Sequence, residues 1–200
     1  MTVPRIDGPR IDDRVAGGPL TDDPLTDALG IGGPRVDDQL PEDDVAAVTV
    51  LLGRRPQGAF EVVVRDADGR PVVIRNAPLL GDGTPMPTRY WLVDGELRRR
   101  VSGLESSGGV RAAEAAVDPV ELARAHDRHA AERDAALPPG HAGPRPSGGV
   151  AGTRKGVKCL HAHYAWHLAG GDDPVGRWVA ERLAEAEAGA GAEAEAGAGA

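Results

Sequence analysis

The order of extended and helical patterns along the chain is the feature that most narrows its fold. Residues 58–78 read GAFEVVVRDADGRPVVIRNAP, two runs rich in β-branched residues joined at DADG (66–69), which predicts a β-hairpin. A proline-stiffened loop then leads into a third extended segment at residues 89–93, and after Asp94 the pattern becomes helical. Strands followed by helices, with no β-α-β alternation, predict an α+β fold: a small antiparallel sheet, formed by the hairpin and the third strand, followed by a cluster of helices.

Helix signals stand on both sides of the predicted sheet. In residues 41–54 a proline and three acidic residues precede an apolar run that ends at Gly53, which is the charge and cap order of a helix. Asp118 followed by Pro119 predicts the start of another helix. The helices expected after the sheet span residues 95–106, 109–117, 118–137, 156–169 and about 174–187.

The two ends of the chain have compositions that do not support a packed core. Residues 1–40 repeat PRIDG, PRIDD and PRVDD among prolines, glycines and aspartates, with isolated aliphatic residues that form no helical or strand face. Residues 188–200 are a low-complexity Ala/Glu/Gly tail, in which each glycine costs about 1 kcal/mol of helix stability. We therefore expect a disordered acidic arm, a single α+β domain over residues 41–187, and a tail that frays or stays disordered.

The formal net charge of −8 lies entirely in these ends. Residues 1–40 carry eight acids against four arginines, residues 184–200 carry four glutamates and no base, and residues 41–183 balance 19 acids with 19 bases. This balance gives no indication of nucleic-acid binding.

The distribution of apolar residues and the number of cysteines indicate in which cellular compartment the protein is found. No run of about 18 apolar residues is present to span a bilayer, and the N-terminus lacks the basic start and apolar stretch of a signal peptide. One cysteine excludes an internal disulfide and a four-cysteine zinc or iron–sulfur site within one chain. These features predict a cytoplasmic protein without membrane insertion.

The segment KGVKCLHAHYAWHLAG gathers the candidate chemistry, because it holds the only cysteine, three of the six histidines and both lysines. On the helix expected here, Cys159, His163 and His167 fall on one stripe at i, i+4 and i+8, while His161 lies at the far border of the apolar face. Cysteine and imidazole ligands suit a divalent metal such as Zn²⁺ or Fe²⁺. Three ligands on successive turns span about 12 Å, however, so at most two of them can reach one ion.

Three interpretations of this segment stay open. The first is a half-buried structural helix whose cysteine acts as a small hydrophobe. The second is a metal site, with Cys159, His161 and His163 as candidate ligands. The third is nucleophilic catalysis by Cys159, which has Lys158 beside it and a place in the first helical turn, where the helix dipole favours a thiolate. His161, His163 and His126 are further candidate catalytic residues in that case.

Helix packing is expected to bring His126 close to the candidate residues of this segment. It lies on the helix expected at 118–137. This helix and the helix expected at 156–169 each carry a face of small residues, so we expect the two to pack and bring His126 near the histidine stripe.

The loop GDGTPMPT (81–88) lacks the Gly-Lys-Ser/Thr ending of a phosphate loop and predicts a structural turn. The candidate ligand-binding residues around these elements are Thr84, Arg89, Tyr90, Arg133 and Lys158.

A series of short motifs runs along the middle of the chain. In order, they are LLGRRPQG (51–58), GRPVVIRNAP (69–78), DGTPMPTRYWL (82–92), LESSG (104–108), His126 with ERD (132–134), VKCLHAH (157–163) and DPVG (173–176). Over about residues 45–183 the chain thereby resembles domain-of-unknown-function family 501 (DUF501), small proteins found chiefly in actinobacteria. The resemblance implies a shared fold and no assigned reaction.

The resemblance also bears on the metal hypothesis. Many members of the family carry a CPCG-like pair of cysteines where this chain has DADG, so that Asp66 and Asp68 stand at the cysteine positions. If the family's cysteines join Cys159 and His161 on a metal, the pair is lost here, which weakens the metal hypothesis or requires oxygen ligands instead.

Two hypotheses of different class follow. The first is a small binding or regulatory module that acts with another protein, with a functional surface joining residues 159–163 to His126 and the loop at 82–90. The second is a metal-binding or Cys/His-dependent enzyme centred on KCLHAH, with a divalent metal ion as its cofactor. The sequence leaves enzymatic activity and substrate open.

Overall fold

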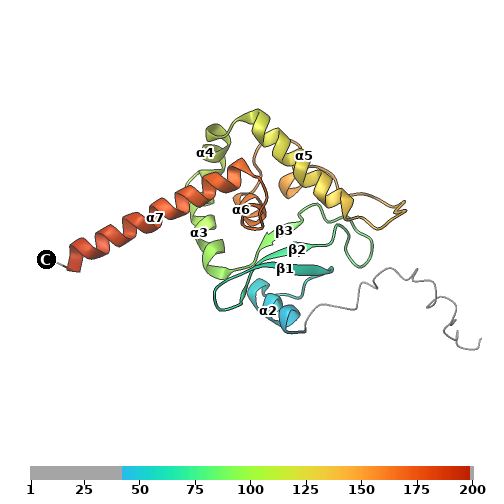
Figure 1. Cartoon of the computed structure of the whole chain (residues 1–200), viewed down its shortest axis with the longest axis horizontal. Coiled ribbons are helices and arrows are strands. Elements are labelled where there is room, and N and C mark those ends of the chain that lie inside the picture. The colour runs from blue at the N-terminus through green and yellow to red at the C-terminus, as the bar shows by residue number, and fades with distance from the viewer. Residues whose placement is uncertain (1–41, 199–200) are drawn as a thin grey trace, which may run out of the picture. The chain divides into compact units, whose positions relative to one another are not determined.

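The computed structural model describes residues 42–198, which form the predicted α+β fold (Figure 1). Its helices are α2 (Glu42–Leu52), α3 (Gly95–Ser106), α4 (Gly109–Ala116), α5 (Pro119–Ala135), α6 (Leu160–Leu168) and α7 (Pro174–Ala198), with a 3₁₀ turn η1 (Val150–Gly152). Its strands are β1 (Phe60–Arg65), β2 (Pro71–Asn76) and β3 (Tyr90–Leu92), which pair antiparallel in the order β1-β2-β3. The predicted hairpin and third strand are thus confirmed, whereas the acidic arm expected at residues 1–40 lies outside the described residues.

The hairpin turn forms at DADG because Asp66 organises it. Its carboxylate accepts hydrogen bonds from the backbone amides of Asp68 (3.0 Å) and Arg70 (2.8 Å). Gly69 adopts φ 81°, a conformation that glycine reaches without strain. Asp66 is therefore committed to the local backbone of the turn.

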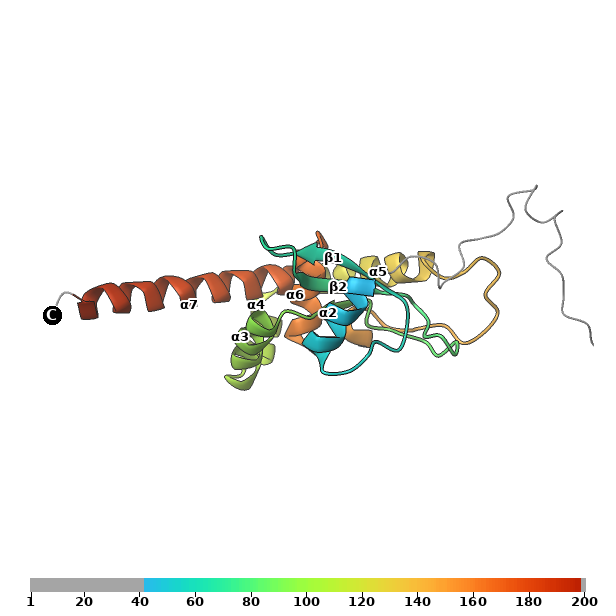
Figure 2. The same cartoon turned by 90° about the horizontal axis from the view of Figure 1, so that it is seen from below.

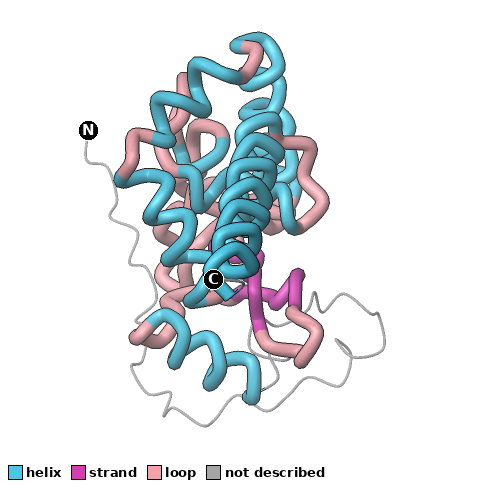
Figure 3. The backbone as a smooth tube through the Cα atoms, turned by 90° about the vertical axis from the view of Figure 1, so that its left-hand side faces the viewer, coloured by secondary structure: helices cyan, strands magenta, loops and turns pink. Residues whose placement is uncertain are grey.

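The sheet separates two hydrophobic clusters. β2 is its central strand and is almost wholly buried. Val48 of α2 packs with Phe60, Ile74 and Val93 in a small cluster, while Val73 belongs to a larger cluster formed with the later helices. Figures 1 and 3 show α2 on one side of the strands and the other helices gathered on the opposite side.

α6 and α7 form a closely packed helical hairpin. Asp173 begins α7 by accepting hydrogen bonds from the amides of Val175 (2.9 Å) and Gly176 (3.0 Å). The glycine at 176 permits the close approach, since a Cβ there would lie 2.3 Å from His167 Cβ and 2.8 Å from the His163 carbonyl oxygen. This hairpin places α6 against β3 and α3, where the candidate site lies.

α6 begins later than the predicted helix over 156–169. Cys159 is extended (φ −155°, ψ 119°) and occupies the N-cap position, so the first helical residue is Leu160. The preceding segment is held outside the helix by tertiary hydrogen bonds, among them that from the Val157 amide to Glu114 (3.2 Å). Because Cys159 precedes the helix, the expected stripe of one cysteine and two histidines along a single helix does not form.

α7 continues to Ala198, beyond the end near residue 187 that the sequence predicted. Alanine and glutamate are strong helix formers, and in this helix they outweigh the interspersed glycines. The side chains that follow Leu183 are exposed up to residue 190, and Figures 1 and 2 show this part of α7 extending beyond the other elements. Across residues 42–198, no helix has both the length and the apolar character that crossing a membrane requires.

Candidate functional site

A cleft of about 720 Å³ is lined by β3, one side of α3, the start of α6 and the segment around the end of α2. Its lining combines an apolar part, which includes Trp91, with a polar part to which Ser102, Cys159 and His161 contribute. The cleft exists because the first turn of α6 packs against both β3 and α3.

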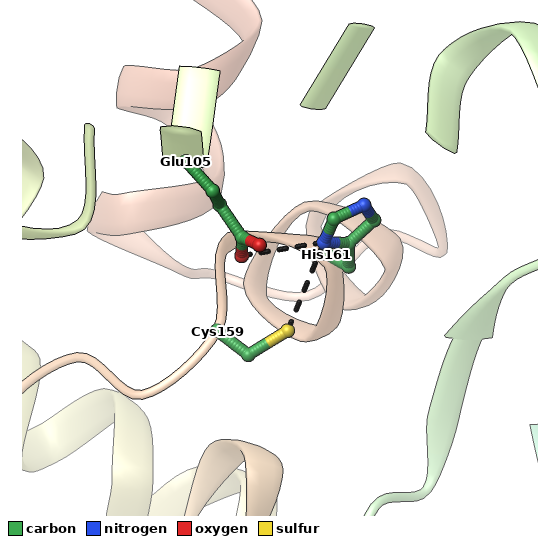
Figure 4. Close-up of side chains that lie close together, drawn as sticks. All are labelled: Glu105, Cys159 and His161. Atoms are coloured by element: carbon green, nitrogen blue, oxygen red, sulfur yellow. Dashed lines mark hydrogen bonds and ion pairs between the residues drawn. The ribbon is translucent and has the colours of Figure 1, made fainter. Parts of the chain in front are cut away.

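Three potential metal ligands meet beside the cleft, two of which, Cys159 and His161, line its polar wall (Figure 4). Glu105 comes from the last turn of α3, Cys159 from the N-cap of α6, and His161 from the first turn of α6. His161 Nδ1 lies 3.2 Å from Glu105 Oε1 and 3.9 Å from Cys159 Sγ. One donor atom from each residue lies within 4.8 Å of the other two.

Backbone contacts orient these side chains. The Nε2–H of His161 donates to the carbonyl oxygen of Arg98 (3.1 Å), which directs Nδ1 toward the other two ligands. Ser102 Oγ lies 3.2 Å from the same Nε2. Glu105 Oε1 accepts the backbone N–H of Leu160 (2.7 Å), one of the free donors at the start of α6. The ligand set is therefore held by α3 and α6 together.

The pKa of His161 is raised to about 9, so that without a metal its imidazole is protonated at neutral pH. The hydrogen bond with Cys159 is the largest cause, and the Arg98 carbonyl and the charge of Glu105 add to it against the opposing effect of burial. A metal that binds Nδ1 must displace this proton, as metals do at other imidazole and thiol ligands.

The distances at this wall suit a tetrahedral ion. The usual bond lengths of zinc imply ligand separations of about 3.3 Å between nitrogen and oxygen and about 3.6 Å between nitrogen and sulfur. The observed 3.2 Å and 3.9 Å require only small side-chain rotations to match these values. Three protein ligands would leave one coordination position for a small molecule.

His163 lies apart from this ligand set. Its Nδ1 is 2.7 Å from Asp173 Oδ2, and both side chains are fully buried between α6 and α7. Asp173 therefore fixes the His163 ring, whose buried Nε2 has no hydrogen-bond partner among residues 42–198. The structure thus brings Cys159 and His161 together with Glu105, whereas His163 belongs to the packing of α6 on α7.

The predicted approach of His126 to the histidines of α6 is confirmed for His163. The two ring centroids are 5.7 Å apart in an edge-to-face arrangement. His126 Nδ1 accepts the backbone N–H of Val150 (3.1 Å), and its Nε2–H donates to the carbonyl oxygen of Gly156 (3.0 Å). Burial lowers the pKa of His126. A neutral His126 thus fastens the loop that leads to Cys159.

Arg89, Tyr90 and Arg133 serve mainly structural contacts. Arg133 is buried in α5 and donates to the carbonyl oxygens of residues 146–148. Arg89 donates to the Asn76 carbonyl (2.9 Å) and also lies 3.5 Å from Glu132. Tyr90 borders the cleft, but its hydroxyl donates to Glu132.

Thr84 and Lys158 lie on the surface, apart from the ligand set. Thr84 is exposed in the turn at 81–88, where its amide donates to Asp82 (2.9 Å), as expected for a structural turn. Lys158 is exposed, with its Nζ 3.4 Å from the Ala151 carbonyl oxygen. The five candidate ligand-binding residues therefore do not converge on one site.

Asp66 and Asp68 lie in the hairpin turn, where both pair with Arg70, and neither belongs to the ligand set. Sequence reasoning missed Glu105 as a ligand. The available signal was its place in LESSG, one of the motifs that carried the family resemblance.

The fold and site together define a small α+β protein with a surface cleft and a Cys/His/Glu ligand set beside it. A scan against protein-family models matches residues 62–181, more than half of the chain, to the family described as "Protein of unknown function (DUF501)". The chain belongs to this family. Searches of curated proteins and of solved structures find no match.

Proposed function

We propose that this chain is a small binding module that holds a divalent transition metal, with zinc as the best fit, on Glu105, Cys159 and His161. The observation that carries the proposal is the convergence of their donor atoms within 4.8 Å of one another beside the cleft. The metal would hold a small ligand at its open coordination position.

The chemistry of the donor set supports zinc. A thiolate, an imidazole and a carboxylate are all common zinc ligands, while magnesium and calcium prefer sites made of oxygen alone. The Arg98 carbonyl accepts a hydrogen bond from the ring nitrogen of His161 that faces away from the other ligands. Such an outer partner is typical of histidines that bind metals.

A second function is favoured by the contact between Cys159 and His161. Sγ and Nδ1 are 3.9 Å apart beside the cleft, and an imidazolium at this position would stabilise a nucleophilic thiolate. In this alternative the chain is a Cys/His-dependent enzyme, with Cys159 as nucleophile and His161 as its charged partner. Either function requires a reduced cysteine, so we place the protein in the cytoplasm.

Zinc stoichiometry tests the metal site. The full chain is equilibrated with Zn²⁺, passed through a desalting column to remove free ions, and analysed by mass spectrometry for metal per chain. We expect about one zinc per wild-type chain and a clear loss in Cys159→Ser, His161→Gln and Glu105→Gln. His167→Gln serves as the matched control, because His167 lies on α6 outside the ligand set.

Two results would contradict the metal site. One is a wild-type chain that retains no zinc; the other is full retention by both Cys159→Ser and His161→Gln. Thermal melts of each variant without metal show whether the fold survives the substitution. Rapid labelling of Cys159 in a wild-type chain that binds no zinc would instead favour the thiol alternative.

A further inference from the structure

The cleft beside the ligand set carries a positive charge that internal ion pairs do not neutralise. Three of its lining residues are arginines: Arg54, Arg98 and Arg99. Arg99 pairs with Glu96, whereas Arg54 and Arg98 form no ion pair with any described residue. None of the described residues that line the cleft is acidic.

A zinc-loaded ligand set would not cancel this charge, because a thiolate and the carboxylate of Glu105 would balance the two positive charges of the ion. The two unpaired arginines therefore leave about two positive charges at the cleft, which suits a dianion.

The apolar residues of the cleft lining determine which kind of molecule can carry the anionic group. Trp91 is half-buried, and the Arg54 guanidinium lies over its ring at 5.5 Å from the centroid. Leu52 and Leu92 extend this apolar part of the lining. A flat apolar group can pack here while a charged group at its end reaches the polar wall.

We propose that the cleft binds a phosphate monoester with an aromatic or apolar body. Its phosphate pairs with Arg54 and Arg98 and would be a further ligand of a zinc ion held by the ligand set, while its body packs along Trp91. This inference rests on the proposed metal site for one of the phosphate contacts, while the arginines and Trp91 supply the others. A carboxylate carries only one charge, and inorganic phosphate lacks the body, so both should bind more weakly.

Calorimetric titration of the zinc-loaded full chain, after removal of free zinc, tests this ligand class. The probes are phenyl phosphate, benzoate and inorganic phosphate, which separate the contribution of the charge from that of the ring. Phenyl phosphate should bind at least about tenfold more tightly than either of the others. Benzoate loses one charge-assisted contact, and inorganic phosphate loses the contacts of the ring.

Variants then locate the site. Arg54→Gln should weaken phenyl phosphate binding by about tenfold or more and leave zinc stoichiometry unchanged. Arg98→Gln gives a second reading, with a thermal melt to confirm folding, because the Arg98 side chain also donates to the Leu51 carbonyl. The matched control is Arg111→Gln, an exposed arginine of α4 that does not line the cleft.

The outcomes separate this inference from the proposed metal site. The phosphate site is wrong if the zinc-loaded protein does not bind phenyl phosphate, or if Arg54→Gln and Arg98→Gln bind it as tightly as the wild type. Neither result contradicts the metal site. A chain that retains no zinc but binds phenyl phosphate through Arg54 contradicts the metal site and supports the anion site.

Discussion

His129 shows how burial sets the charge of a single residue. Its side chain is 1% exposed in α5, between the rings of Tyr90 and Trp166, with centroid distances of 6.2 Å and 5.2 Å. Burial, assisted by the nearby charge of Arg133, lowers the pKa of His129 to about 4. Burial also lowers the pKa of His126. The folded protein therefore keeps these two imidazoles neutral at pH values where an unfolded chain protonates them.

This difference predicts a loss of stability in mild acid. In the unfolded state His129 titrates near pH 6.5, so its contribution is fully present above that pH and falls as the pH drops from about 6.5 to about 4. The full decrease in the free energy of unfolding is about 3 kcal/mol for His129. Urea denaturation of the metal-free chain between pH 7.5 and 4.5 measures the larger part of this decrease.

The variant His129→Phe isolates this effect, because it keeps an aromatic ring in the same packing and cannot take up a proton. Its free energy of unfolding should fall less than that of the wild type over this pH range. The difference between the two proteins at pH 7.5 reports the change in packing alone. Parallel pH profiles for the variant and the wild type would show that His129 does not carry the acid sensitivity.

Cys159 illustrates a residue whose environment depends on chain segments far away. Its apolar neighbours in sequence predict a buried thiol. In the structure it is half-buried beside the cleft, because Cys159 precedes α6 and does not share the buried face of that helix. Its chemistry is therefore set by Glu105 and His161.

At the scale of elements, the packing of α6 on α7 depends on the absence of a side chain at Gly176. The Cβ of an alanine there would overlap His167 Cβ and the His163 carbonyl. Gly176→Ala should lower the free energy of unfolding by at least about 2 kcal/mol, because neighbouring backbone must move. Urea denaturation at neutral pH measures this loss.

Gly103→Ala is the matched control for this prediction. Gly103 is exposed in α3, and a Cβ built there meets no atom within 4 Å. This substitution should stabilise the protein by up to about 1 kcal/mol through helix propensity. If Gly176→Ala is as stable as Gly103→Ala, the close approach of α6 and α7 is wrong.

For the whole molecule, the two hydrophobic clusters define what is needed to fold. Both consist of residues between Val45 and Leu183, and the part of α7 after Leu183 is exposed up to residue 190. We predict that a chain of residues 41–188 melts within about 2 °C of the full-length chain. The expectation that residues 1–40 are dispensable rests on their sequence, in which isolated aliphatic residues among prolines, glycines and aspartates form no helical or strand face.

Thermal denaturation of the two chains, followed by circular dichroism, tests this prediction. The matched control ends at residue 176, which removes the buried Val179 and Leu183 and should unfold the protein or lower its melting temperature sharply. A chain of residues 41–188 that is itself unfolded would show that the removed segments contribute to the core.

The sequence alone determined the features that depend on neighbouring residues. The hairpin at DADG, the helix start at Asp118 and Pro119, and the order of strands before helices were all predicted and are confirmed. Turn formation, capping and hydrophobic periodicity act over a few residues, so a single sequence carries their signals.

Only the tertiary structure decided which side chains share a site. Glu105 meets the start of α6 across 55 residues of sequence, because α3 packs against α6 and the Leu160 amide needs an acceptor. His163 is directed to Asp173 by the packing of α6 on α7, although it stands only two residues from His161. Local propensity does not encode such long-range contacts. They arise when helices pack and buried polar groups must find partners.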